Sequence, residues 1–242
     1  MSKKLKQGKC IHCLKWTSEL TEDHVLPRSW YVLTVPSNEE KWTAPSCRLC
    51  NGSLGQMEND LFIKLALCLN ITNDYTKAIR QRVMDMLNPD LTKDFIQKQA
   101  RLKKIKELLA DTRPGDGSRE GLFPNFDYHD GYDPKIQRTM PIPKIPLQKF
   151  GEKLIKGIEY NKSNRYIDAG YSLEVIYAHP ETIRDVTKLI HDKRWSTHHY
   201  HPQGFEFYRA LPPQGFPIIY QVKIWDRFEV FGTLGKTGEI YE

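Results

Sequence analysis

Hydrophobic positions repeat at helical spacing over a long stretch of the first half of the chain. From Met57 to about Arg113, apolar side chains recur every three or four residues, which predicts a series of amphipathic helices over residues 63–113. The segment Asn88-Pro89-Asp90 interrupts this pattern, and because proline disrupts a helix interior we expect one helix to end there. The repeating positions are Leu61, Phe62, Leu65 and Leu69, then Tyr75, Ile79, Val83 and Met86, and finally Leu91, Phe95, Leu102, Ile105, Leu108 and Leu109.

A proline-rich stretch follows the helical segment. Six of the 15 prolines lie between Pro114 and Pro146, so we expect residues 114–147 to form an extended linker. This stretch also carries an aromatic run that could lie over a core, made up of Phe123, Phe126, Tyr128 and Tyr132.

The pattern after the linker changes between helical and alternating. Helical periodicity covers residues 147–160 and 180–192, and strand-like segments cover residues 172–178, 205–210, 217–225 and 228–234. The short link Asp226-Arg227 predicts a tight hairpin between the last two strands. Residues 148–242 are therefore expected to form an α+β domain with a mainly antiparallel sheet. His198, His199 and His201 are expected to lie in a solvated loop before Pro202 rather than in a metal site.

Composition and charge narrow the classes of function. The chain has 242 residues, a hydrophobic fraction of 39 % and ordinary globular composition, which excludes fibrous and wholly disordered proteins. No run approaches the about 18 apolar residues of a membrane span, and no apolar run follows the basic start, so we expect a soluble, cytoplasmic protein.

The net charge is +6, and residues 61–113 carry 11 basic against 6 acidic side chains. This surplus permits contact with a polyanion without requiring it.

Four of the five cysteines form two C-x-x-C pairs, Cys10 with Cys13 and Cys47 with Cys50. Because the cytosol keeps thiols reduced, such pairs predict metal ligands rather than disulfides. Four thiolates suit one closed, tetrahedral and structural zinc site. The 33 residues between the pairs exceed the spacing of a simple zinc ribbon, which indicates an insertion within the finger. Cys68 stands apart and is expected to be a small core residue.

The insertion and the residue after the second pair carry side chains that could act as a general base and as ligands of a divalent cation. Neutral imidazole, with an unperturbed pKa of about 6.5, is a suitable base near neutral pH, so His24 is the candidate general base. Hard cations such as Mg²⁺ or Mn²⁺ take oxygen ligands, and Asp23 and Asn51 supply one carboxylate and one amide oxygen.

The order of the motifs C-x-x-C, D-H-V-x-P and P-x-C-x-x-C-N resembles the zinc-bearing subgroup of HNH endonucleases, of the ββα-metal (His-Me finger) class, over about residues 8–62. The resemblance implies that residues 1–62 form a zinc-bound finger of two strands and a helix. It implies that Asp23 and Asn51 hold one divalent cation, that His24 activates water, and that a distorted strand end lets both neighbours serve one site. The family's middle asparagine is replaced here by Trp42 or Thr43.

Other side chains near this centre are weaker candidates. Glu58 could be an additional metal ligand, or it could favour the start of the expected helix as acidic residues do. Arg28 and Arg48 flank the expected centre and could contact substrate phosphates. His12 is expected to take a turn position, and Trp30 to pack beneath the finger.

The favoured function is a metal-dependent endonuclease acting on DNA, with RNA as a further substrate to consider, in a phage, restriction or defence setting by analogy. Two alternatives are a non-catalytic zinc module that binds nucleic acid and a protein-interaction module, since the ligand of residues 148–242 is unknown. A second copy of the chain and an activating protein are the protein partners to consider.

Overall fold

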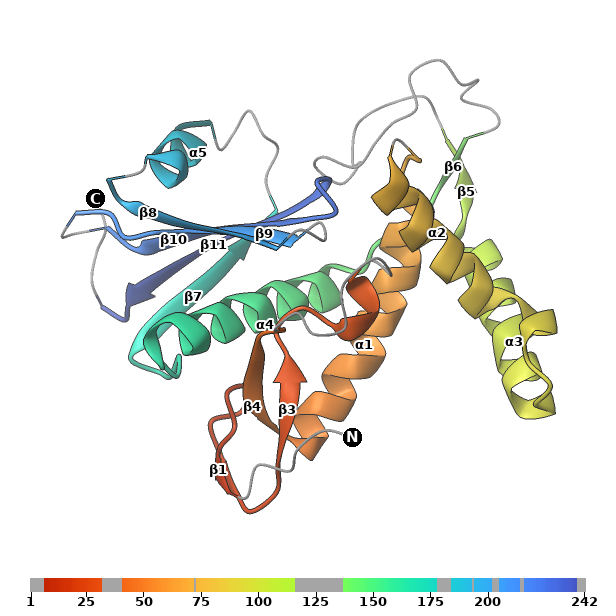
Figure 1. The fold of residues 1–242 in the computed structure, drawn as a ribbon, viewed down its shortest axis with the longest axis horizontal. Helices are drawn as coiled ribbons and strands as arrows, with labels where there is room; N and C mark the ends of the chain where they lie inside the picture. Colours follow the sequence, from red (N-terminus) through yellow and green to blue (C-terminus); the bar gives the residue numbers. More distant parts are fainter. Residues whose placement is uncertain are drawn as a thin grey trace.

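The computed structural model describes residues 7–31, 41–71, 73–115, 137–177, 184–192, 194–201, 205–213 and 216–238 (Figure 1). The aromatic run of residues 123–132 lies outside the described residues. The helices are α1 (Arg48–Cys68), α2 (Asp74–Leu87), α3 (Phe95–Asp111), α4 (Lys144–Ser163) and α5 (Arg184–His191), with two 3₁₀ turns, η1 (Arg28–Trp30) and η2 (Pro89–Leu91). The strands are β1 (Gly8–Lys9), β2 (Trp16–Thr17), β3 (Leu20–His24), β4 (Thr43–Cys47), β5 (Arg113–Pro114), β6 (Arg138–Thr139), β7 (Tyr171–Ile176), β8 (Ser196–His201), β9 (Phe205–Ala210), β10 (Ile218–Ile224) and β11 (Phe228–Lys236).

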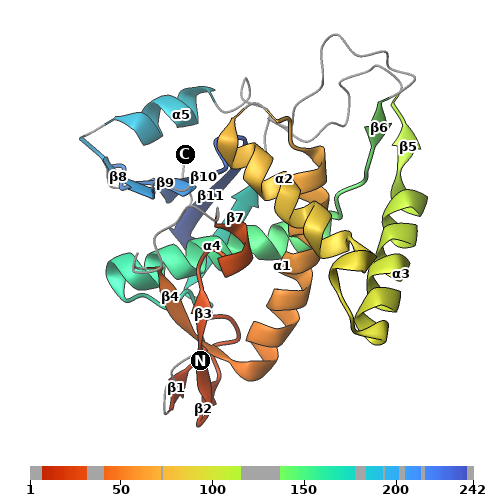
Figure 2. The ribbon, with the colours of Figure 1, turned by 45° about the vertical axis from the view of Figure 1, so that its right-hand side comes forward.

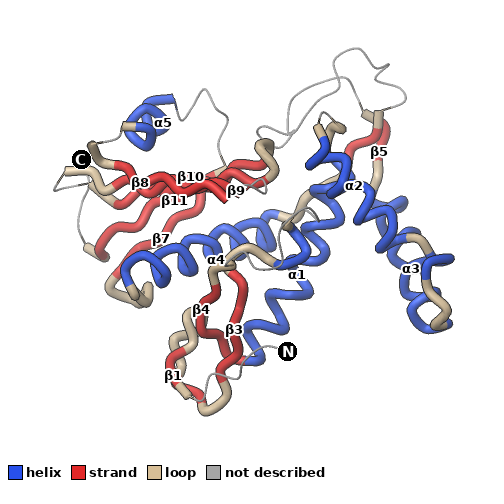
Figure 3. Tube along the Cα trace, in the orientation of Figure 1, coloured by secondary structure: helices blue, strands red, loops and turns tan. Residues whose placement is uncertain are grey.

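Helix α4 lies between a five-stranded sheet and the β3–β4 hairpin (Figures 1 and 3). The sheet has the order β7-β11-β10-β9-β8, and all of its neighbouring strands are antiparallel. Helix α5 covers the opposite face of this sheet, where Ile190 packs against Ala210, Ile219 and Phe231. Helix α1 contacts both the hairpin and α4. The chain is therefore a mixed α+β protein with an antiparallel C-terminal sheet, as the hydrophobic pattern predicts.

Strand β8 corrects the prediction of a solvated loop around the histidines. Residues 196–201 pair with β9 along their whole length and form an edge of the sheet. His198 stacks on its cross-strand partner Tyr208 with ring centroids 4.3 Å apart, and His199 stacks on Phe207 at 4.8 Å. Ring pairs of this kind stabilise neighbouring strands. The imidazole rings therefore pack as flat groups within the sheet. The prediction of a loop treated these histidines only as polar residues.

Helix α2 packs on α1, and α3 lies beyond α2 on the side away from the sheet (Figure 2). The predicted break at residues 88–90 is confirmed, because α2 ends at Leu87 and a 3₁₀ turn follows. The apolar stripe expected along α3 is only partly buried. Leu108 is buried, whereas Phe95 and Leu109 are exposed, because α3 packs mainly against α2 and η2.

The two longest helices are α1 and α4, and both carry charged side chains within their spans. In the part of the chain that the structure describes, no helix combines the length and the apolar character needed to cross a membrane.

An aromatic cluster joins the N-terminal finger to the C-terminal sheet. Trp30 is fully buried and stacks on Phe150 of α4 at 4.4 Å and on Trp225 at 5.1 Å between ring centroids. The indole Nε1 of Trp225 donates to the backbone oxygen of Trp30 at 2.8 Å. The expectation that Trp30 packs beneath the finger is confirmed. One core cluster therefore extends from Val25 through α4 to the sheet.

Two glycines allow α4 to approach both of its neighbours closely. A Cβ atom at Gly157 would lie 2.6 Å from a methyl carbon of Val25, next to the hairpin. A Cβ atom at Gly232 of β11 would lie 2.1 Å from Ile155 of α4, on the side of the sheet. Both distances are far below normal carbon–carbon contact, so each position requires a residue without a side chain.

We predict that Gly157→Ala lowers the free energy of unfolding by about 1–3 kcal/mol, because the added methyl group overpacks against buried Val25. The same substitution in α1, Gly55→Ala, meets no atom within 4 Å and should raise that free energy by about 0.5–1 kcal/mol through helix propensity. Urea unfolding of both variants measures whether each substitution lowers or raises the free energy of unfolding. A neutral or stabilising Gly157→Ala would contradict the close packing of α4 on the hairpin.

Candidate functional site

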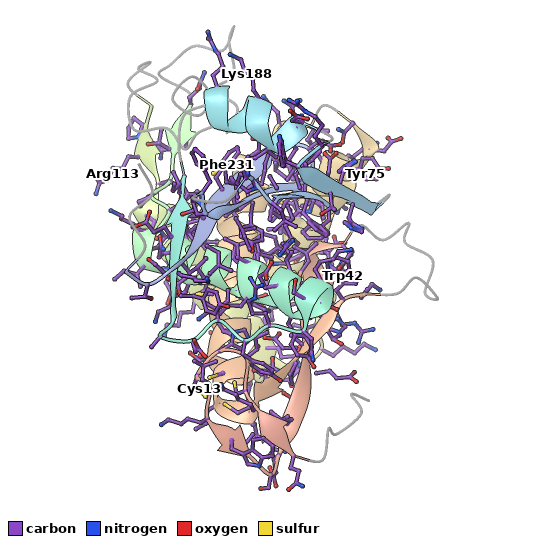
Figure 4. The ribbon with its side chains drawn as sticks, turned by 90° about the vertical axis from the view of Figure 1, so that its left-hand side faces the viewer. Cys13, Trp42, Tyr75, Arg113, Lys188 and Phe231 are labelled. Atoms are coloured by element: carbon purple, nitrogen blue, oxygen red, sulfur yellow. The ribbon has the colours of Figure 1, made fainter. Side chains whose placement is uncertain are left out.

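The four paired cysteines converge at one end of the molecule, remote from Phe231 and α5 (Figure 4). Their sulfur atoms all lie within 4.8 Å of one another, and Cys13 Sγ lies 3.9 Å from Cys47 Sγ. Tetrahedral zinc with Zn–S bonds of about 2.3 Å requires sulfur atoms about 3.8 Å apart. The cluster could therefore hold one zinc ion, consistent with a zinc finger. Within the described residues it is the one group of three or more histidine, cysteine or acidic side chains placed in this way.

Two tight turns present these sulfur atoms. In the first, Leu14 takes a left-handed conformation with φ of 62°, and its backbone N–H donates to the oxygen of Cys10 at 2.9 Å. In the second, Cys47 is the N-cap of α1, and its sulfur accepts from the backbone N–H of Cys50 at 3.4 Å. Each turn directs both sulfurs of its pair to the same side.

The charge environment favours ionised thiols at part of this cluster. Burial by itself raises the pKa of Cys10, but backbone hydrogen bonds from residues 12, 13 and 47 outweigh it and lower the pKa to about 7. Burial and the neighbouring thiols raise the pKa of Cys50 well above its ordinary value. Four sulfurs this close cannot all ionise without a cation between them, because like charges repel. A metal ion supplies that charge.

The opposite end of the β3–β4 hairpin carries Asp23 and His24. Leu20 pairs with Cys47 at the cysteine end, and His24 pairs with Thr43 at the other end. The register continues through His24 without a bulge, so the distorted strand end implied by the resemblance is not observed. Adjacent side chains of a regular strand point to opposite faces. Asp23 and His24 therefore leave β3 on different sides.

Asp23 is buried, and both of its carboxylate oxygens have partners. His12 Nε2 donates to Oδ2 at 2.8 Å, and Lys153 Nζ of α4 lies 2.9 Å from Oδ1. Burial disfavours the charged form of Asp23, but the His12 hydrogen bond and the Lys153 charge outweigh it and lower its pKa. The carboxylate is therefore held ionised in a nearly dry environment.

Glu58 belongs to the same buried group. It lies on α1, it is 6 % exposed, and its Oε1 contacts the ammonium of Lys153. Burial raises the pKa of Glu58 to about 7, although the Lys153 charge acts in the opposite direction. Lys153 thus lies between two carboxylates, one from the hairpin and one from α1.

His24 is half-buried, and its surroundings favour the neutral imidazole. Burial lowers its pKa first, and the positive charge of Arg28 adds to this, while Asp23 opposes it. The Nδ1 atom of His24 is buried and has no hydrogen-bond partner among the described residues. A buried ring nitrogen without a partner is uncommon in folded proteins and marks a position where a ligand or water atom could bind.

The remaining candidates take different places around the finger. Asn51, in the first turn of α1, donates from Nδ2 to Thr21 Oγ1 at 2.8 Å, which puts it against the same face of β3 as Asp23. Arg28 is exposed in η1, just beyond the His24 end of the hairpin. Arg48 is exposed at the start of α1, at the cysteine end. Only Arg28 therefore lies on the His24 side.

Two residues of this centre were not predicted as partners of Asp23, and the sequence contains a signal for one of them. Lys153 is three residues after Phe150 and four before Gly157, so it falls on the apolar stripe of α4, where a lysine is out of place. His12 was expected only as a turn residue. No spacing rule links it to Asp23, because the contact depends on how the first cysteine turn folds against β3.

Comparison of the chain with protein-family models, with curated proteins and with solved structures gave no match. Its class is therefore defined by the fold and the site alone, as a mixed α+β protein with a four-cysteine cluster that could bind a metal.

We predict that the purified chain contains about one zinc ion, and that Cys13→Ser abolishes stoichiometric zinc because it removes one of four ligands. Cys68→Ser is the matched control and should retain the metal, because Cys68 lies on α1 outside the cluster. Elemental analysis after gel filtration measures the zinc content of both variants. Equal zinc content in the two variants would contradict the cluster as the metal site.

Proposed function

We propose that the chain is a metal-dependent endonuclease of the HNH (ββα-metal) class that hydrolyses phosphodiester bonds of DNA. The observation that carries this proposal is the position of His24. It ends the first strand of a β3–β4–α1 unit, with a half-buried imidazole, a lowered pKa and a buried Nδ1 atom without a partner among the described residues.

The general base in this proposal is the neutral imidazole of His24. Hydrolysis requires a water molecule to lose a proton as it attacks phosphorus, and a base acts on it only while unprotonated. Burial and the nearby guanidinium of Arg28 lower the pKa of His24, so the ring stays neutral near pH 7. The same guanidinium is exposed and could bind a phosphate oxygen of the substrate.

The strand that carries His24 is held in place through its partner strand β4. The backbone N–H of Val25 donates to the oxygen of Trp42 at 2.9 Å, which extends the pairing of β3 past His24. Asn161 Nδ2 of α4 donates to the oxygen of Thr43, the residue paired with His24, at 3.1 Å. These contacts fix the backbone that carries the imidazole, which supports a positioned base.

Asp23 and Asn51 are the residues that would hold a divalent cation, since Asn51 of α1 packs on the face of β3 that carries Asp23, and both offer the oxygen ligands that Mg²⁺ and Mn²⁺ prefer. A cation bound there would neutralise charge on the scissile phosphate and the leaving oxygen, provided that the end of β3 distorts so that Asp23 and His24 reach the same phosphate. In the arrangement described, Lys153 and His12 already bind the Asp23 carboxylate. The donor chemistry therefore fits the cation, provided that Lys153 moves away.

We predict that purified protein with Mg²⁺ or Mn²⁺ nicks supercoiled plasmid DNA and that His24→Ala reduces the rate by about 10²-fold or more, because the base is lost. His198→Ala is the matched control. Its side chain pairs with Glu206 on the sheet edge, far along the chain from the finger, and nicking should be unchanged. Zinc content measured on each variant confirms that the finger is still folded.

Other results of this assay would decide against the proposal. Equal nicking by wild type and His24→Ala would show that another group, or a contaminant, cuts the DNA. Retardation of DNA in gels without cleavage in either metal would favour a non-catalytic zinc module. Running the same assay with RNA separates the two nucleic acids as substrates.

A further inference from the structure

The buried group around Lys153 holds a positive charge where the proposed nuclease would bind its metal. Asp23, Glu58 and Lys153 are only 4 %, 6 % and 3 % exposed. Lys153 Nζ lies 2.9 Å from Asp23 Oδ1 and contacts Glu58 Oε1. A charged lysine is rarely buried unless it is paired, so these two carboxylates account for its position.

Lys153 is delivered to this position by α4 and not by the finger itself. Lys153, Gly157 and Asn161 are spaced by four residues and form one face of α4. That face meets Asp23, Val25 and Thr43 of the finger in turn.

The other face of α4 meets the sheet, where Glu159 pairs with Arg209 and accepts a hydrogen bond from Tyr220. The position of the Lys153 ammonium beside Asp23 therefore depends on how α4 packs between the sheet and the β3–β4 hairpin.

One ammonium and one divalent cation cannot share these carboxylates at contact distance. Each carboxylate oxygen that Lys153 occupies is unavailable as a ligand, and two cations side by side in a buried site repel strongly. His12 occupies the second oxygen of Asp23, which leaves the carboxylate no free route to an ion from that side. A divalent cation therefore cannot bind these carboxylates while the Lys153 ammonium is in the observed position.

We propose that Lys153 is an internal competitor for the divalent cation, and that Asp23, with Asn51 and Glu58 beside it, binds Mg²⁺ or Mn²⁺ only when the Lys153 ammonium leaves its position between the two carboxylates. This inference rests on the proposed function, because the cation concerned is the one that the nuclease would use. It makes the observed arrangement a resting form of the site.

The test measures binding of Mn²⁺ by the full chain, from the paramagnetic resonance signal of the free ion, with the protein loaded with zinc. Lys153→Met removes the ammonium while keeping a flexible side chain of similar length. We expect its Kd for Mn²⁺ to be lower than that of wild type by about tenfold or more. Lys153→Arg keeps the charge and should bind no more tightly than wild type. Adding Asp23→Asn to Lys153→Met should abolish the gain, which assigns the ion to this carboxylate.

A stability measurement keeps the inference testable if Lys153→Met is poorly folded. Without Mn²⁺ this variant leaves buried Glu58 without its ion pair and buried Asp23 with only the His12 hydrogen bond, so its Tm should fall, and Mn²⁺ should restore it. Arg209→Met is the matched control, because it breaks the buried pair with Glu159 on the opposite side of α4. Its Tm should fall without recovery in Mn²⁺.

The outcomes separate this inference from the nuclease proposal. Equal Kd values for wild type and Lys153→Met overturn the competitor role, and so does tighter Mn²⁺ binding that persists after Asp23→Asn is added. In either case, plasmid nicking by wild type would still support the nuclease proposal. Tighter Mn²⁺ binding by Lys153→Met, with no cleavage by any form, supports the competitor role and counts against the nuclease. Absence of Mn²⁺ binding in every form overturns the competitor role.

Discussion

Helix α4 packs against two layers at once, and the arrangement of the rest of the structure depends on this double contact. On one side Gly157 lets the helix lie against Val25, directly after the strand that carries His24. On the other side Gly232 lets Ile155 enter the surface of the sheet. Burial on both sides accounts for the apolar residues around most of the circumference of α4. It also places the finger and the sheet in one continuous core, together with Trp30.

The same double contact puts charged groups where water is scarce, and each side of α4 resolves this differently. Toward the sheet, Glu159 and Arg209 form a buried pair that Tyr220 completes with a hydrogen bond. Toward the finger, two carboxylates face a single ammonium, so the charges do not balance when both acids are ionised. Burial then raises the pKa of Glu58 to about 7 while Asp23 stays ionised. Perturbed pKa values of this kind occur both at functional sites and in buried ion-pair networks that stabilise a fold.

The local pattern of apolar and polar residues predicted most of the secondary structure. It failed where a residue type plays an unusual structural role, such as histidine in a strand. The helix break at residues 88–90 and the hairpin of β10 and β11 follow from proline and from a short polar link. Strand β8 was missed because its histidines pack as rings against Tyr208 and Phe207. The apolar stripe of α3 was correctly placed on a helix, yet Phe95 remains exposed because periodicity states which residues share a face and not what covers that face.

By itself, the sequence determined the four-cysteine cluster, because two C-x-x-C turns are local structures that direct their sulfurs to one side whatever the rest of the chain does. It also determined that His24 and Asp23 occupy adjacent positions of a strand. Only the tertiary structure decided what surrounds them. Lys153 and Glu58 are 95 residues apart, and both their ion pair and the contact of Lys153 with Asp23 depend on how α4 and α1 pack on the hairpin. Burial and charge act through space, so the pKa values of these groups follow from packing that sequence spacing does not describe.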